Sequence, residues 1–216
     1  MSEERHIVIV GGGIIGCSIA YFLSQRSDCP KVTVLESSKD VAPGASGKAG
    51  GFLALDWHGT STASLAALSF DLHRELAEKE NGAELWGYRT VDTHQLSLDT
   101  SRKSRTRPKL DWLNQNVFLT MSLIGGGGTT AQVTPGKLTR FLVKKAQDSG
   151  VSLRVQTKAQ GLSFGDDGKV NGVQIRADGR EELLPATDVV LATGPWTGKL
   201  LQSWLTPDTI PSYLPP

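Results

Sequence analysis

The sequence predicts an α/β fold, and three features near the N-terminus lead to that prediction. The apolar run His6–Val10 is typical of a buried strand, and it ends in three consecutive glycines. Residues 17–27 follow with the apolar spacing of a helix. A second apolar strand, Lys31–Leu35, comes next and is followed by Glu36. A strand, a helix and a strand in this order predict parallel strands joined by a crossover helix.

The glycine turn after the first strand carries the pattern GxGxxG on Gly11, Gly13 and Gly16. Gly11 permits a tight turn, Gly13 lets the backbone approach a pyrophosphate, and Gly16 lets the helix pack close to the strand. The free N–H groups at the helix start, around Ile14 and Ile15, favour an anion there together with the helix dipole. The pattern therefore predicts a Rossmann-like domain that binds a dinucleotide.

An acidic residue stands at the end of the second strand. Glu36 lies 20 residues after Gly16, where a carboxylate can hydrogen-bond the diol of a ribose. A carboxylate at this place repels a 2′-phosphate, so NADP is disfavoured. The turn and the acid alone do not distinguish FAD from NAD.

The stretch 37–57 is rich in glycine, proline and serine, and it predicts a loop without a regular element. Because the loop follows the second strand, it lies on the same side of the sheet as the glycine turn. It can supply backbone N–H groups and the Ser46 hydroxyl to a second part of a cofactor. A flexible surface loop is the alternative.

Three short segments resemble the N-terminal signature of the D-amino acid oxidase family of FAD-dependent oxidoreductases: GGGIIG at 11–16, VLE at 34–36 and GASGKAGG at 44–51. They are most similar to a fungal branch of oxidoreductases, one member of which is linked to endosome-to-Golgi traffic. The resemblance implies a Rossmann-like FAD-binding domain, with a parallel sheet and an antiparallel β-meander, plus an α+β substrate domain. It implies non-covalent FAD as the cofactor.

The resemblance also assigns the parts of the FAD site. The glycine turn binds the pyrophosphate, the acid binds the adenosine ribose, and the Ser-Gly loop runs beside the flavin. Ala159 contacts the adenine through its backbone, and the ATG turn at 192–194 packs beside the cofactor. The residues that the resemblance assigns to FAD are Gly11, Gly13, Ile14, Ile15, Gly16, Glu36, Ser37, Ala45, Ser46, Gly47, Lys48, Ala49, Gly50, Gly51, Ala159, Ala192, Thr193, Gly194 and Trp196.

For an intact relative, the resemblance implies oxidation of a C–N bond in a small amine or amino acid, by hydride transfer to the flavin. Lys48 is the candidate catalytic residue, because a cation beside the flavin stabilises negative charge on the reduced ring. A Lys48 side chain that points to solvent or to a phosphate is the alternative. Arg89 is a weaker candidate for binding a substrate carboxylate. His58 is an alternative point for covalent flavin attachment, but it follows the Ser-Gly loop.

The remaining elements are predicted from apolar spacing and from turn residues. The helix 64–79 has a leucine stripe at Leu65, Leu68, Leu72 and Leu76, with charged residues on its exposed side. Thr134 and Pro135 are typical of a helix start. Further along the chain, the sequence predicts strands within 86–100 and 151–157, a short helix at 110–114, a three-stranded meander at 161–184 and a buried strand at 188–193.

The resemblance extends over residues 6–204 but corresponds to only the first half of a family member. We therefore expect a truncated form, with an incomplete substrate domain and apolar surface that drives association. The predicted FAD-binding domain is discontinuous and covers 1–62 and 132–205. The partial substrate domain covers 63–131, and 206–216 form a proline-rich tail.

The composition is that of an ordinary globular protein, with 38% hydrophobic residues, 21% charged residues and a net charge of +1. This balance gives no electrostatic case for nucleic acid or an anionic membrane, and no apolar run approaches the length of a membrane span. Cys17 and Cys29 form no metal-binding pattern and no disulfide framework. We therefore expect no metal. The polar N-terminus predicts a cytoplasmic protein, and the resemblance adds association with endosomes.

Two other function classes stay open at this point. One is a non-catalytic protein that binds nucleotide or takes part in trafficking, and the basic run at 100–109 makes it more plausible. That run is otherwise expected to be an exposed loop. The other is an NAD-dependent dehydrogenase built on the same glycine turn.

Overall fold

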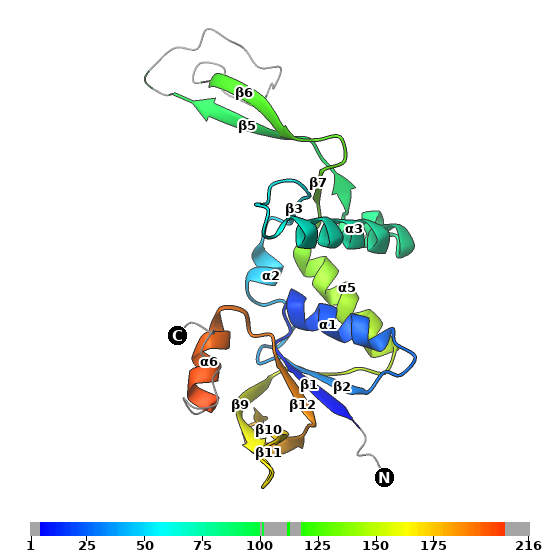
Figure 1. Ribbon diagram of the computed structural model, residues 1–216, viewed down its shortest axis with the longest axis vertical. Coiled ribbons are helices and arrows are strands. Elements are labelled where there is room, and N and C mark those ends of the chain that lie inside the picture. Colours follow the sequence, from blue (N-terminus) through cyan, green and yellow to red (C-terminus); the bar gives the residue numbers. More distant parts are fainter. Residues whose placement is uncertain (1–4, 100, 102–111, 113–117, 206–216) are drawn as a thin grey trace. The chain divides into compact units, whose positions relative to one another are not determined.

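The structure is a computed structural model of the chain, and it describes residues 5–99, 101, 112 and 118–205. The chain divides into two compact units, and Figure 1 labels most of their elements. The first unit comprises Met1–Ala49 and Pro135–Pro216, and the second comprises Gly50–Thr134. The glycine turn and Glu36 belong to the first unit.

The first unit is built on a four-stranded parallel sheet in the order β12-β1-β2-β8. In this sheet β1 (His6–Val10) pairs with β2 (Lys31–Leu35) and with β12 (Asp188–Leu191). The fourth strand, β8 (Ser152–Arg154), pairs with β2. The predicted α/β fold with a parallel sheet is confirmed, and β1 and β2 have the predicted bounds.

The central strand β1 is buried on both faces, because its alternate side chains enter two different cores. Ile9 packs in a cluster with side chains of the two helices α1 (Ile14–Ser24) and α5 (Pro135–Asp148). Val8, one residue earlier, packs in a second cluster with side chains of the β-meander. Helices therefore cover one face of the sheet and the meander covers the other.

The meander has three antiparallel strands in the order β11-β10-β9. They are β9 (Thr157–Phe164), β10 (Val170–Ala177) and β11 (Arg180–Pro185). The predicted meander is confirmed, although its first strand begins four residues before the predicted start at 161. Ala159 therefore lies in the meander itself and not in the strand that precedes it.

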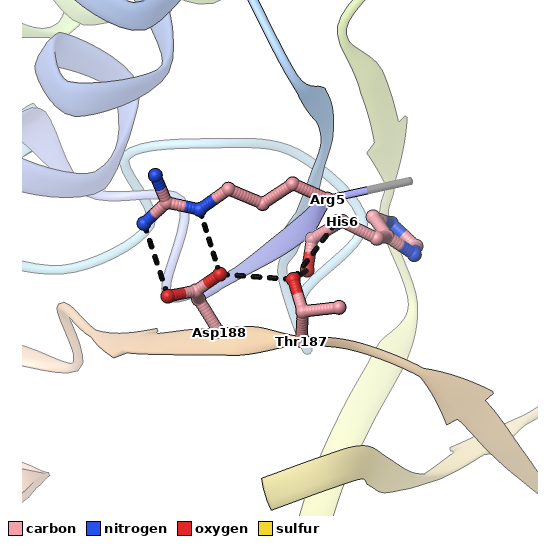
Figure 2. A network of polar contacts seen from close by, with 4 residues as sticks. All are labelled: Arg5, His6, Thr187 and Asp188. Carbon is pink, nitrogen blue, oxygen red and sulfur yellow. Dashed lines mark hydrogen bonds and ion pairs between the residues drawn. The ribbon is translucent and has the colours of Figure 1, made fainter. Parts of the chain in front are cut away.

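A polar network joins the amino-terminal ends of β1 and β12 (Figure 2). The Arg5 guanidinium donates from Nε and Nη2 to the two carboxylate oxygens of Asp188, at 2.9 and 3.1 Å. The backbone N–H of His6 donates to Thr187 Oγ1 at 3.0 Å. The Arg5 guanidinium holds the pKa of the Asp188 carboxyl below its ordinary value. These contacts fix the sheet at the end opposite to the glycine turn.

The stretch 37–57 contains two short regular elements, so the prediction of an entirely irregular loop is wrong. They are α2 (Ala45–Lys48) and β3 (Phe52–Ala54). The single helical turn α2 requires glycine at position 47, because a Cβ there would lie 2.1 Å from the carbonyl oxygen of Ala42. β3 is regular because it gains the antiparallel partner β7 (Thr130–Gln132).

Among its described residues, the second unit contains two small antiparallel sheets and two helices. One sheet has the order β3-β7-β4, and the other pairs β5 with β6. The strands predicted within 86–100 are confirmed, and β6 ends at the first of the four consecutive glycines at 125–128. The elements not yet given are α3 (Ala63–Lys79), α4 (Gly82–Trp86), β4 (Arg89–Thr90), β5 (Thr93–Leu98) and β6 (Phe118–Gly125).

The helix α3 has nearly the predicted bounds, but its leucine stripe is not its buried face. Leu65 and Leu68 are 66% and 58% exposed. The buried side chains of α3 are Phe70 and Ala77, and the helix contacts α4 and β3. The periodicity identifies the residues that share a face, whereas tertiary contacts decide which face is covered.

The chain after β12 turns through a short 3₁₀ helix, η1 (Gly194–Trp196), into α6 (Thr197–Trp204). The predicted basic run at 100–109 and the short helix at 110–114 lie outside the described residues, apart from residues 101 and 112. The tail at 206–216 also lies outside them.

Candidate nucleotide-binding site

A cavity of about 820 Å³ lies in the first unit, at the carboxyl ends of β1, β2 and β12. This edge of a parallel sheet is where open α/β folds bind their ligands. Among the described residues, five segments line the cavity, and all five belong to the first unit. They are Val10, Gly11 and 13–15 after β1, 35–38 after β2, 43–46 in the Ser-Gly loop, 157–159 in β9, and 191–197 with Lys199, Leu200 and Ser203 after β12.

The start of α1 presents backbone donors to this cavity. The N–H groups of Gly13, Ile15 and Gly16 have no acceptor in the described part of the chain. The N–H of Ile14 donates to Ser46 Oγ at 2.9 Å. Unpaired N–H groups and the positive end of the helix dipole make such a terminus a binding place for an anion.

The first and third glycines of the turn are required by close contacts. Gly11 has a φ of +116°, and a Cβ there would lie 2.4 Å from the carbonyl oxygen of Ala192. A Cβ on Gly16 would lie 2.0 Å from the carbonyl oxygen of Gly11. The first contact brings the turn after β12 against the turn after β1, and the second brings α1 against its own turn.

The Glu36 carboxylate lies at the cavity and is held by backbone donors. Its Oε2 accepts from the N–H of Gly12 at 3.0 Å, and its Oε1 accepts from the N–H of Ser38 at 2.8 Å. Oε1 also accepts from the Ser37 hydroxyl at 3.3 Å, so the lone pair that remains for another hydrogen bond is on Oε2. Glu36 is 7% exposed, so its orientation is fixed before any ligand arrives.

The loop from β2 to α2 is fixed in two places. The N–H of Ala42 donates to the carbonyl oxygen of Gly12 at 2.9 Å. Asp40 accepts from Nε of Arg140 on α5 at 2.9 Å, and this guanidinium lowers the pKa of the Asp40 carboxyl. These contacts carry the loop across the glycine turn and bring Ser46 to Ile14.

Thirteen of the predicted site residues line the cavity. The other predicted residues lie elsewhere: Gly16 is packed beneath the turn, and Gly47 is packed against Ala42. Lys48 is exposed at the end of α2, and Ala49 follows it; neither lines the cavity. Gly50 and Gly51 belong to the second unit. The residues that the structure brings together are Gly11, Gly13, Ile14, Ile15, Glu36, Ser37, Ala45, Ser46, Ala159, Ala192, Thr193, Gly194 and Trp196.

The two remaining side chains singled out from the sequence both lie in the second unit. Arg89 donates to the Gly87 carbonyl oxygen at 3.0 Å and to the side chain of Gln132. The His58 Nε2 lies 3.2 Å from the carbonyl oxygen of Ala54. The roles proposed for Arg89 and His58 from the sequence stay predictions.

Sequence reasoning missed the part of the cavity wall that α6 supplies, after the predicted Trp196. Lys199 and Ser203 lie four residues apart, so they share one face of the helix. That spacing is the signal that predicts the wall once the ATG turn is placed at the cavity. The other cavity residues that the sequence did not indicate include Ser38, Pro43, Gly44, Thr157, Lys158, Pro195, Thr197 and Leu200.

The family model of the DAO family, described as FAD dependent oxidoreductase, matches residues 6–214. The chain belongs to this family. The structural resemblance agrees: glycine oxidase from Bacillus cereus superimposes with a TM-score of 0.74 at 22% identity, over 92% of this chain and 58% of that chain. The predicted Rossmann-like class and the predicted family are both confirmed.

Two fungal proteins are similar to this DAO-family chain. The Schizosaccharomyces pombe protein "Putative oxidoreductase C1F5.03c" is 36% identical over 222 residues, which cover 93% of this chain and 57% of the relative. The Saccharomyces cerevisiae protein "Putative oxidoreductase TDA3" is 47% identical over 100 residues, 44% of this chain and 18% of the relative. The chain thus spans a little over half of the first of these relatives.

No helix within the described ranges 5–99 and 118–205 combines the length and the apolar character that crossing a bilayer requires.

Proposed function

We propose that the first unit binds FAD non-covalently through the ADP portion of the cofactor. We further propose that the chain is the FAD-binding part of an enzyme that oxidises a C–N bond of a small amine or amino acid. The observation that carries the proposal is that unpaired N–H groups at the start of α1 and the Glu36 carboxylate line one cavity.

The turn and the Ser-Gly loop fit a diphosphate. The N–H groups of Gly13 and Ile15 are unpaired donors, and they lie at the positive end of the α1 dipole. The Ser46 hydroxyl accepts from Ile14, and its own proton is available to a phosphate oxygen. Gly13 adds no side chain between these donors and the ligand.

Glu36 fits the adenosine ribose. Its Oε2 is held by Gly12 and its Oε1 by Ser37 and Ser38, so the remaining lone pair, on Oε2, has a fixed direction. A hydroxyl of the ribose diol can donate to this oxygen, whereas a 2′-phosphate meets a like charge. The acid therefore supports FAD or NAD over NADP.

The proposal of non-covalent binding comes from the family resemblance. Held only by hydrogen bonds and packing, FAD is expected to be released in unmodified form when the protein unfolds.

Bound flavin supplies the two-electron acceptor for a hydride from the carbon next to the substrate nitrogen. The described residues of the first unit bind and orient the nucleotide. Lys48 stays the catalytic candidate on the grounds given by the resemblance, because it lies two residues after Ser46. The C–N bond as the point of oxidation also comes from the resemblance, and family membership supports it.

Direct titration of the purified chain tests the proposal. FAD and ADP should bind, and denaturation of the FAD-loaded protein should release intact FAD with its absorption spectrum. Addition of an amine or amino acid without oxygen tests the activity, because a substrate bleaches the flavin absorbance. A chain that binds neither FAD nor ADP contradicts the proposal.

The same titration separates the alternative functions. Binding of NAD without binding of FAD favours a dehydrogenase. Binding of FAD with no bleaching by any amine or amino acid favours a non-catalytic nucleotide-binding protein.

A further inference from the structure

Few charged side chains line the nucleotide cavity, and more of them are positive than negative. The described lining residues include one carboxylate, Glu36, and two amines, Lys158 and Lys199. Neither amine has an ion-pair or hydrogen-bond partner among the residues that the structure describes. Both lysines are therefore available to a negatively charged ligand.

The two lysines come from different walls of the cavity. Lys158 follows Thr157, whose N–H donates to the backbone carbonyl oxygen of Glu36 at 2.9 Å. This contact attaches the first strand of the meander to the end of β2. Lys158 thus belongs to the part of the cavity beside Glu36, where the proposed site holds the ribose.

Lys199 follows the turn after β12, and that turn lies against the glycine turn. The strands β1 and β12 are parallel neighbours, and their carboxyl ends open on the same edge of the sheet. The carbonyl oxygen of Ala192 lies so close to Gly11 that a Cβ could not fit there. Lys199 follows on α6, on the same helix face as Trp196 and Ser203.

A diphosphate bound at the glycine turn would be stabilised by a positively charged side chain nearby. The diphosphate of FAD carries two negative charges, and the helix dipole offsets only about half an elementary charge. The buried Glu36 carboxylate repels the diphosphate further. A mobile amine can approach a phosphate without a fixed geometry, as lysines commonly do in phosphate sites.

We propose that Lys199 is the cation that binds the diphosphate of the nucleotide in this cavity. Lys158 lies near the ribose and contributes less. This assignment rests on the proposed function, and it extends the site to a residue of α6 that no part of the glycine turn or the Ser-Gly loop indicates.

The test compares equilibrium titrations of ADP, FAD and adenosine with the unmodified chain and with Lys199→Ala. The substitution is expected to weaken binding of ADP and FAD by about three- to tenfold, because one partly screened ion pair is lost. Binding of adenosine, which has no phosphate, should not change. The salt dependence of ADP binding should also become weaker.

Three further variants serve as controls. Lys199→Arg retains the charge and should retain most of the affinity for ADP. Lys158 lines the same cavity, and Lys158→Ala should reduce ADP affinity less than Lys199→Ala does. Lys169→Ala removes an exposed lysine at the tip of the meander, outside the cavity, and should leave all three affinities unchanged. Thermal unfolding of each variant checks that the fold is intact.

The outcomes distinguish this assignment from the proposed function. Equal ADP affinity in the unmodified chain and in Lys199→Ala overturns the role of Lys199 and leaves the nucleotide site standing. Equal losses for ADP and adenosine also overturn it, because they indicate a packing role. If the unmodified chain binds neither ADP nor FAD, the proposed function fails and the assignment of Lys199 fails with it.

Discussion

The hydroxyl oxygen of Ser46 accepts a hydrogen bond from the backbone N–H of Ile14 at 2.9 Å, across 32 residues of sequence. This contact joins the Ser-Gly loop to the first turn of α1. The hydroxyl thus satisfies one of the N–H groups that a diphosphate would otherwise meet. Its neighbours Gly13 and Ile15 keep their N–H groups unpaired within the described residues.

The substitution Ser46→Ala should weaken nucleotide binding and slightly destabilise the first unit. Loss of a hydroxyl that bonds the first turn of a helix costs about 1 kcal/mol of unfolding free energy. Loss of the same hydroxyl from the diphosphate site should weaken ADP binding by about three- to tenfold. Chemical denaturation and ADP titration measure the two effects.

Ser24→Ala is the matched control for this prediction, because Ser24 Oγ bonds the Tyr21 carbonyl oxygen at the other end of α1. It should leave ADP affinity unchanged. If Ser46→Ala binds ADP as tightly as the unmodified chain does, the Ser46 hydroxyl has no part in the site.

Gly16→Ala should destabilise the first unit strongly. A Cβ at this position would lie 2.0 Å from the Gly11 carbonyl oxygen, which is backbone and cannot turn aside. Overpacking of this kind costs about 1–3 kcal/mol or more. Gly198→Ala on α6 is the control, since a Cβ there meets no atom within 4 Å.

Gly198→Ala should raise the unfolding free energy by about 0.5–1 kcal/mol, because alanine has the higher helix propensity. The two substitutions add the same methyl group and are predicted to act in opposite directions. Urea denaturation measures both, and similar effects would contradict the close contact between α1 and its turn.

Glu36→Gln should remove the preference for a complete ribose. The unmodified chain is expected to bind ADP about tenfold more tightly than 2′-deoxy-ADP, since a hydrogen bond between a hydroxyl and a carboxylate is lost in the latter. In Glu36→Gln the two affinities should approach each other. An unchanged ratio in the variant would show that the carboxylate does not bind the ribose.

This variant also tests how Glu36 is held. An amide supplies one oxygen, whereas the carboxylate accepts from the backbone N–H groups of both Gly12 and Ser38. One of these N–H groups then faces another donor, and a buried unsatisfied group costs about 1–3 kcal/mol. Denaturation of the variant in the absence of nucleotide measures this cost separately from binding.

The elements closest to the glycine turn could be predicted from the sequence because their chemistry leaves few alternatives. Strand β1 is apolar at every position from Ile7 to Val10, and it ends at a tight turn that requires glycine at position 11. Glu36 and Ser46, which line the cavity, are indicated by the sequence for a similar reason: a bound ribose would need an acceptor and a bound diphosphate would need donors at fixed places. Local sequence carries all of this information.

Other features depend on contacts between distant segments, and local patterns do not contain them. Lys199 comes to the cavity only because β12 pairs with β1 across more than 170 residues. The exposed face of α3 is a second example. Helical spacing groups Leu65 with Leu68, but the buried side chains of the helix are Phe70 and Ala77.

The two cysteines should differ in reactivity and in their effect on stability at high pH. Cys17 is fully buried, and its thiol donates to the Gly12 carbonyl oxygen at 3.5 Å. Burial, and then the charge of Glu36, raise the pKa of the Cys17 thiol from its ordinary value of 9.0 to about 12. Cys29 is only half-buried. Iodoacetamide at mildly alkaline pH should therefore alkylate Cys29 and leave Cys17 unmodified until the protein unfolds.

The raised pKa of Cys17 also sets the direction of a pH effect. The unfolded thiol loses its proton above pH 9.0, whereas the folded thiol retains it up to about 12. The contribution of Cys17 to stability is therefore fully present below pH 9.0 and is lost as the pH rises toward 12. One proton corresponds to a slope of at most about 1.4 kcal/mol per pH unit. Unfolding free energies measured across this range should fall less steeply for Cys17→Ala than for the unmodified chain or for Cys29→Ala. Equal slopes in all three proteins would show that the Cys17 thiol ionises alike in the folded and unfolded states.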